Sequence, residues 1–243
     1  MSPVRIHPWL VWGFTTVAVF AQSGCTVVSG NGDIVTQQRN LTGFSQIETL
    51  GPFDVRVDDG PTFQVSVTAD SNIQQYIETR LDGQVLIIDA PLGTTFNNAT
   101  YQVDVVLPAL TKADFAGSGS MGIVLANPGS DLSLASEGSG LVTVNAQLAT
   151  LNLQETGSGA INLVGKAQSW TALVTGSGRV DGRNMQVQDA AITVTGSGTL
   201  LALVEHNASF LLSGSGSIDW WGKATVISSS STGSGHITHH DGE

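Results

Sequence analysis

The residues of this 243-residue chain that could do chemistry are acidic side chains at repeated positions. Enzymes that cleave polysaccharides hold two carboxylates close together, for general acid and base work or to bind calcium. In the repeat described below, Asp181 and Asp219 share one position, but Leu201 occupies it in the intervening repeat. Asp131 and Asp189 share a second position and are three repeats apart. Neither pair is expected to meet at one site.

Two further carboxylates, Glu137 and Glu155, lie in neighbouring repeats but at different positions within the repeat. In a strand, that difference predicts side chains on opposite faces. We therefore expect no catalytic residue and a protein that is not an enzyme. A glycan lyase or hydrolase is the alternative, because a carboxylate of the repeats could still pair with one from the less regular N-terminal half.

Metal-ligating residue types gather near residue 240: His236, His239, His240, Asp241 and Glu243. A short polar segment of this kind is more often solvated than folded around an ion. We expect no bound metal and no cofactor. The consecutive residues Trp220 and Trp221 should face opposite ways in a strand, one inward and one outward. The outward ring could stack on a sugar, although a role in the core or at the end of the fold is the simpler interpretation.

The composition excludes other classes of partner. Only 12% of residues are charged, and nine basic residues stand against twenty acidic ones, for a net charge of −11. No basic run is present to contact phosphate backbones, so we expect no nucleic-acid partner. The single cysteine excludes an internal disulfide and a cysteine-based zinc site. A hydrophobic content of 41% is enough to bury a core.

Residues 1–25 have the pattern of an export signal. Arg5 precedes a mostly apolar run from Leu10 to Ala21, which is shorter than the roughly 20 residues of a membrane-spanning helix. The tripeptide that ends at Cys25 resembles the end of a bacterial lipobox, with Gln22 where an aliphatic residue is usual. Cys25 is therefore the predicted lipidation site, and the membrane a predicted partner through that lipid. Ordinary cleavage after the serine of this tripeptide is the alternative.

The second half of the chain is built on the tripeptide Gly-Ser-Gly, which occurs seven times at spacings of 18 to 21 residues. Apolar and polar residues alternate between the tripeptides, which is typical of strands and not of a flexible linker. Because glycine adopts positive φ without a steric penalty, each tripeptide is predicted to form a structural corner. The corner glycines are Gly117, Gly119, Gly138, Gly140, Gly157, Gly159, Gly176, Gly178, Gly196, Gly198, Gly214, Gly216, Gly233 and Gly235.

One position of the repeat, four residues after the first corner glycine, is apolar in every copy. Its members are Met121, Val142, Ile161, Val180, Leu200, Ile218 and Ile237. Stacked rungs of strand would place these side chains over one another in a continuous core. The sequence therefore predicts an all-β fold, a right-handed parallel β-helix with rungs of about 19 residues, each made of two or three short strands. The corner serines would form a ladder in which small hydroxyls satisfy one another and the corner backbone; a ligand track or an ice-binding face is the functional alternative.

The first half is predicted to hold strands without a fixed period, forming less regular turns and a cap for the hydrophobic stack. A short helix is possible between Ser71 and Arg80. The predicted strands are Ile34–Arg39, Phe44–Leu50, Phe53–Asp58, Phe63–Ala69, Val85–Ile88 and Tyr101–Leu107.

Several segments together resemble the bacterial family named putative auto-transporter adhesin, head GIN domain. They are Gly30–Val35, Leu41–Ile47, Phe53–Val57, the Gly-Ser-Gly series and Asp219–Gly222, and the resemblance spans about residues 28–238. It implies a parallel β-helix in an exported or lipid-anchored protein of the cell envelope, and it does not by itself imply any activity.

Four segments follow from these observations: a signal peptide over 1–25, irregular β turns and a cap over 26–110, regular repeats over 111–238, and a polar tail over 239–243. We expect a non-enzymatic envelope lipoprotein, an adhesin or surface interaction module with a protein or glycan partner. An outer-membrane location is predicted, on either its periplasmic or its surface side. The alternative is a β-helix protein that binds or cleaves a polysaccharide.

Overall fold

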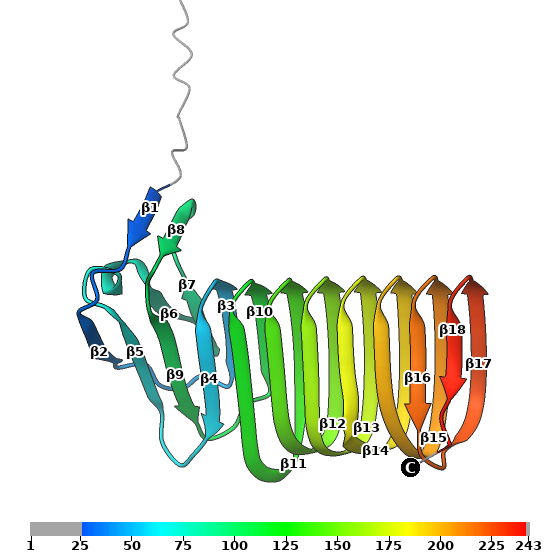
Figure 1. Cartoon of the computed structure of the whole chain (residues 1–243). Helices are drawn as coiled ribbons and strands as arrows, with labels where there is room; N and C mark the ends of the chain where they lie inside the picture. Colours follow the sequence, from blue (N-terminus) through cyan, green and yellow to red (C-terminus); the bar gives the residue numbers. More distant parts are fainter. Residues whose placement is uncertain (1–25, 242–243) are drawn as a thin grey trace, which may run out of the picture.

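The computed structural model describes residues 26–241, which form strands and a single short 3₁₀ turn (Figure 1). Cys25 and the predicted signal peptide lie outside the described residues, as does Glu243. Sixteen strands belong to one continuous sheet, and the remaining two pair with each other. The expected all-β parallel solenoid is confirmed.

The repeats form a stack of parallel strands in which each rung pairs with the one before it. The Gly-Ser-Gly tripeptides lie at one edge of this stack, which is the upper edge in Figure 1. Its strands are β10 (Lys112–Gly117), β11 (Ser120–Gly138), β12 (Leu141–Gly157), β13 (Ala160–Gly176), β14 (Arg179–Gly196), β15 (Thr199–Gly214), β16 (Ser217–Trp221), β17 (Thr225–Gly233) and β18 (His236–His239).

A rung differs from the expected two or three short strands. Each of β11 to β15 is one strand of 16 to 19 residues that runs along one face, bends at the lower edge and returns along the other (Figure 1). Pairing between β12 and β13 continues through the bend almost without interruption, whereas in β11 it stops at Leu125 and resumes at Ser130 with a register shift. In β11 to β15 the strand itself is therefore interrupted only at the Gly-Ser-Gly edge.

The predicted inward position is confirmed by register and burial. Met121, Val142 and Ile161 pair in sequence, and the series continues to Ile237 in the last rung. Every member is at most 1% exposed except Ile237, which has a neighbour on one side only. This column forms the spine of one hydrophobic cluster that extends into the N-terminal half.

The two glycines of a corner are required for different reasons. The first has positive φ in six of the seven tripeptides, for example +116° at Gly138, where a side chain would be strained. The second lies against the preceding rung, so that a Cβ at Gly140 would come within 2.3 Å of the Phe115 ring. Gly117 belongs to this close-approach class too, because a Cβ there would lie 1.9 Å from the Gly51 carbonyl oxygen.

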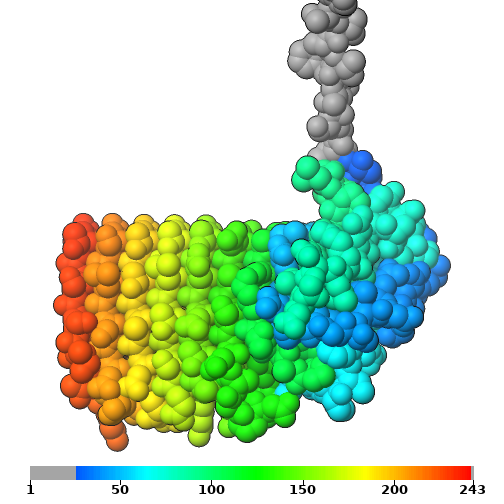
Figure 2. Space-filling model, turned by 180° about the vertical axis from the view of Figure 1, so that it is seen from behind, coloured from blue at the N-terminus to red at the C-terminus, as the bar shows by residue number. Residues whose placement is uncertain are grey.

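The N-terminal half continues both faces of the solenoid and then ends them with antiparallel strands. One face runs from β10 through β3 and β7 to β6, and the other from β11 through β4 and β9 to β5 and β2. Figure 2 shows this half as a broader block at one end of the stack. The elements are β1 (Thr26–Ser29), β2 (Ile34–Arg39), β3 (Gln46–Gly51), β4 (Asp54–Asp59), β5 (Gln64–Asp70), η1 (Gln74–Tyr76), β6 (Glu78–Asp82), β7 (Val85–Asp89), β8 (Thr94–Asn97) and β9 (Tyr101–Leu107).

The six strands predicted in this half are present, each within two residues of its expected ends. The expected helix between Ser71 and Arg80 is only the 3₁₀ turn η1, because the chain enters β6 at Glu78. The pairing of β1 with β8 was not predicted, since these short segments lack a clear alternation and are 60 residues or more apart in sequence.

Candidate functional site

The aspartates that could have formed a catalytic pair are separated as their positions predicted. Asp181 pairs in register with Leu201, which in turn pairs with Asp219. The register from Asp131 passes through Thr150 and Ser169 before it reaches Asp189. Two rungs or more therefore separate the members of each pair.

Glu137 and Glu155 lie on opposite faces, as expected, but the inward member is unusual. Glu155 is 0% exposed and stands in a core column between Ser136 and Val174 of the adjacent rungs. Neither of its carboxylate oxygens accepts a hydrogen bond of ordinary geometry. Burial raises the pKa of Glu155, and the nearby Ser136 hydroxyl and Gly159 amide offset only part of this effect. A carboxylate enclosed in this way cannot reach an external substrate.

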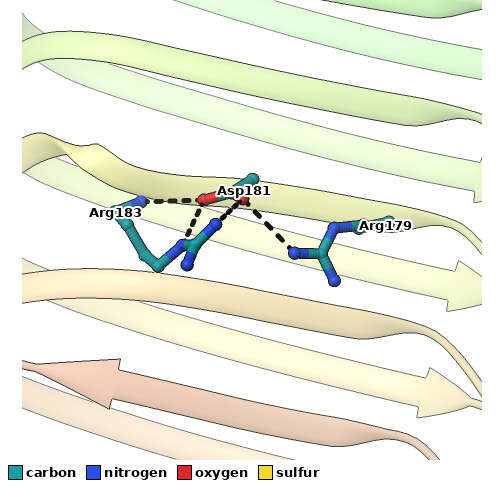
Figure 3. A network of polar contacts seen from close by, with 3 residues as sticks. All are labelled: Arg179, Asp181 and Arg183. Carbon is teal, nitrogen blue, oxygen red and sulfur yellow. Dashed lines mark hydrogen bonds and ion pairs between the residues drawn. The ribbon is translucent and has the colours of Figure 1, made fainter.

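Asp181 is the centre of a small ionic network on the outer face of β14 (Figure 3). Its carboxylate accepts a hydrogen bond from Arg183 at 2.6 Å and one from Arg179 at 3.3 Å. The hydrogen bond from Arg183 is the main cause that lowers the pKa of Asp181. The two arginines stabilise the ionised form of Asp181, so this aspartate is poorly suited to accept a proton as a general base.

The two tryptophans point to opposite faces of β16, as predicted, and each ring stacks on a histidine of the last rung. Trp220 faces inward, is 6% exposed and stacks on His239 with ring centroids 3.8 Å apart. Trp221 faces outward and stacks on His240 at 4.5 Å, while the Arg183 guanidinium lies 5.8 Å from its centroid. In the sheet, β16 is followed by β18 on one side and by β15 and then β14 on the other, so His240 and Arg183 approach Trp221 from opposite sides.

His240 also contacts Asp219, with 2.8 Å between Nε2 and a carboxylate oxygen, whereas His239 and Asp241 are 3.9 Å apart. Within residues 26–241, no group of three or more histidine, cysteine, aspartate and glutamate side chains is arranged to hold a metal ion. The histidines near residue 240 are instead engaged in stacking and pairing at the end of the solenoid.

The corner serines differ from the expected hydroxyl ladder. They are exposed, and in the part of the chain that the structure describes no hydrogen bond joins the hydroxyls of successive corners. The corner ladder is made by the backbone instead: the amides of Ser158, Ser177 and Ser197 donate to glycine carbonyls of the preceding rung at 2.8 to 2.9 Å. The geometry of the corner therefore depends on the backbone and its glycines.

A further cavity lies in the N-terminal half, and the sequence did not predict it. It has a volume of about 570 Å³ and is lined by Gln37, Arg39, Ser71, Gln74, Gln75, Ile77 and Thr79. These residues come from β2, from the segment around η1 and from the start of β6. Arg39 and Gln74 are 35 residues apart, so no local motif marks their meeting. We call this site the Arg39 pocket.

The fold is a two-faced parallel β-solenoid that ends in antiparallel strands. Its family follows from similarity to known protein families. The chain belongs to the family named putative auto-transporter adhesin, head GIN domain, which matches residues 43–224. No curated protein sequence is significantly similar to the chain. Among the described residues, no helix has the length and apolar character needed to cross a membrane.

Three solved structures share the fold at low sequence identity. A putative adhesin from Bacteroides fragilis superposes with a TM-score of 0.78 and 20% identity, covering 88% of this chain and 100% of that one. A putative adhesin from Parabacteroides merdae gives 0.67 and 21%, covering 88% and 99%. A putative lipid binding protein from Parabacteroides distasonis gives 0.67 and 21%, covering 88% and 100%. At these identities the likeness concerns the fold alone.

Proposed function

We propose that this protein is a non-enzymatic adhesin or interaction module of the cell envelope, exported and anchored by a lipid on Cys25. Membership of an adhesin-like family supports an exported or surface location. The observation that carries the proposal is where the solenoid's acidic residues lie and what they contact. Asp181 and Asp219 are two rungs apart, as Asp131 and Asp189 are three rungs apart. Glu155 is enclosed in the core, and Asp181 is held by two arginines. Asp114 does lie in register beside Glu48 of β3, but it is paired with Lys112.

The N-terminal tip of the molecule supports the lipid anchor. β1 begins at Thr26, directly after Cys25, and the Thr26 amide donates to the Gly93 carbonyl at 2.9 Å. The turn between β7 and β8 therefore lies beside the start of β1, as Figures 1 and 2 show. Leu92 at this turn is fully exposed, and Val27 of β1 is 63% exposed. The turn residues 90–93 and β1 carry no charge, so the tip can approach a bilayer without the cost of removing an ion from water.

The lipid anchor is tested by the mass of the N-terminal peptide of the protein purified from membranes. A peptide that begins at Cys25 and carries acyl chains is expected, and an unmodified peptide that begins one residue earlier would contradict the anchor.

The absence of catalysis is tested separately, by incubating the protein with envelope and plant polysaccharides and measuring new reducing ends and unsaturated uronates. We expect none. Turnover that scales with protein concentration would contradict the non-enzymatic part of the proposal and favour a polysaccharide lyase or hydrolase.

A second candidate, polysaccharide binding without cleavage, is favoured by the Arg39 pocket. Its lining is mainly amide and hydroxyl side chains around one cation. Side chains of these types form the hydrogen bonds that orient polar ligands in small-molecule sites.

A further inference from the structure

The Arg39 pocket has the size and the lining of a site for a small polar ligand. Its volume of about 570 Å³ falls within the range of roughly 300 to 1,000 Å³ that is usual for small-molecule sites. Ile77, which is only 3% exposed, contributes the apolar contact, and Gln37, Ser71, Gln75 and Thr79 contribute polar groups. The pocket lies where the antiparallel strands end the solenoid, away from the Trp221 surface.

The Arg39 guanidinium is held in place by neutral groups. It donates to the Gln37 side-chain oxygen at 2.8 Å and to the Gln74 side-chain oxygen at 3.2 Å. Gln74 is itself 4% exposed, and its amide nitrogen donates to the carbonyls of Val35 and Val67 at 2.9 and 2.8 Å. Both N–H groups of Gln74 are thus committed, and its oxygen is directed to Arg39. The arginine is therefore oriented before any ligand arrives, which reduces the entropy lost on binding.

No carboxylate of the described residues neutralises this cation. The pocket lining contains no acidic side chain. Of the acids nearest in sequence to the lining residues, Asp70 accepts the amides of Gly32 and Thr100 at 2.6 and 2.7 Å, and Glu78 lies 3.9 Å from Arg80. Two of the five guanidinium N–H groups are used by the glutamines, so three remain for a ligand.

This set of groups matches one ligand chemistry. A planar guanidinium with several available N–H groups recognises a carboxylate, and the surrounding amides and hydroxyls match the hydroxyl groups of a sugar ring. We propose that the Arg39 pocket binds a uronic acid unit of an acidic polysaccharide, with its carboxylate on Arg39. The inference rests on the proposed role as an interaction module and names the class of ligand that this module takes.

The binding test uses the purified full-length protein, titrated calorimetrically with a trimer of galacturonic acid. The fully methyl-esterified trimer is the matched ligand control, because it has the same sugar rings without the charge. We expect the acid to bind in the micromolar to millimolar range and the ester to bind at least about 10-fold more weakly, since hydrogen bonds to a charged group contribute about 1.5 to 3 kcal/mol.

Two variants test whether the ligand binds in the Arg39 pocket. Arg39→Gln removes the cation and should weaken binding of the acid at least about 10-fold, whereas Arg56→Gln, at an exposed arginine of β4, should leave binding unchanged. Gln75→Glu adds a negative charge at an exposed position of the lining without altering Arg39, and should also weaken binding. Because Gln75 is exposed, this second variant tests the pocket even if Arg39→Gln folds poorly.

The outcomes separate this inference from the proposed function. Absence of binding, equal binding of acid and ester, full binding by both pocket variants, or equally tight binding of inorganic phosphate would overturn the uronate site and leave the interaction module standing. Shortening of the trimer, followed by mass spectrometry in the same samples, would overturn the non-enzymatic function instead.

Discussion

Replacing Glu155 by methionine should make the protein more stable at neutral pH. The carboxylate is 0% exposed, and neither of its oxygens accepts a hydrogen bond of ordinary geometry. Leaving a buried polar group without a partner costs about 1 to 3 kcal/mol, and more when the group is charged. Methionine has a similar length and is apolar, like Val174 and Val194, which occupy the same column in the next two rungs. We expect a gain of about 3 kcal/mol at pH 7.

The gain should depend on pH in a definite direction. Because burial raises the pKa of Glu155 in the folded state above that in the unfolded chain, the folded protein binds the extra proton. Wild-type stability is therefore undiminished below the unfolded pKa and falls as the pH rises through the folded pKa. The advantage of Glu155→Met should be small near pH 4 and reach its full value above the folded pKa.

The assay is thermal unfolding followed by circular dichroism, measured from pH 4 to above the folded pKa for the wild type, for Glu155→Met and for a control variant. A gain of about 3 kcal/mol corresponds to roughly 6 to 12 °C for a chain of this size. Glu137→Gln, at an exposed glutamate of the preceding rung, is the control and should change the melting temperature little at any pH. A Glu155→Met protein that melts below the wild type at pH 7, or that shows the same advantage at pH 4, would refute the reasoning.

Three further predictions concern the core, the corners and the N-terminal tip. Val180→Asp should cost more than about 4 kcal/mol and abolish cooperative melting, because it places an unpaired charge in the apolar column; an unchanged melting temperature would contradict that column. Gly138→Ala should destabilise by about 2 kcal/mol in a thermal melt, because φ is +116° and the new Cβ would lie 2.6 Å from a backbone oxygen. Gly122→Ala, which has open space around it, is its control and should be nearly neutral. For the N-terminal tip, a nitroxide label is placed at Leu92→Cys on the acylated protein in vesicles, and a control label at Ile227→Cys on β17. The Leu92 label should be more accessible to oxygen than to a water-soluble nickel chelate, unlike the control label. Equal behaviour of the two labels would contradict a tip at the membrane.

Sequence alone predicted the regular part of the fold because each rung repeats the same local rules. The alternation of Val142, Thr143 and Val144 assigns inside and outside, and the spacing of the glycine corners assigns the register between rungs. A period of two within the strand and a period of about 19 between rungs leave few ways to pair the chain. The separation of Asp181 from Asp219 could be predicted for the same reason.

Tertiary structure alone decided what each position contacts across rungs and across the two halves. The Arg39 pocket joins residues of β2 and η1. The Arg39 side chain is oriented by Gln74, which in turn is held by carbonyls that it reaches only in the folded state. Likewise, Trp221 faces outward as its strand position predicts, but its ring is covered by His240, which belongs to another rung. Local periodicity determines the direction of a side chain, whereas its partners depend on distances that exist only after the rungs have stacked. For that reason the sequence predicted a solenoid with no catalytic pair, and only the folded chain revealed the pocket that could bind a ligand.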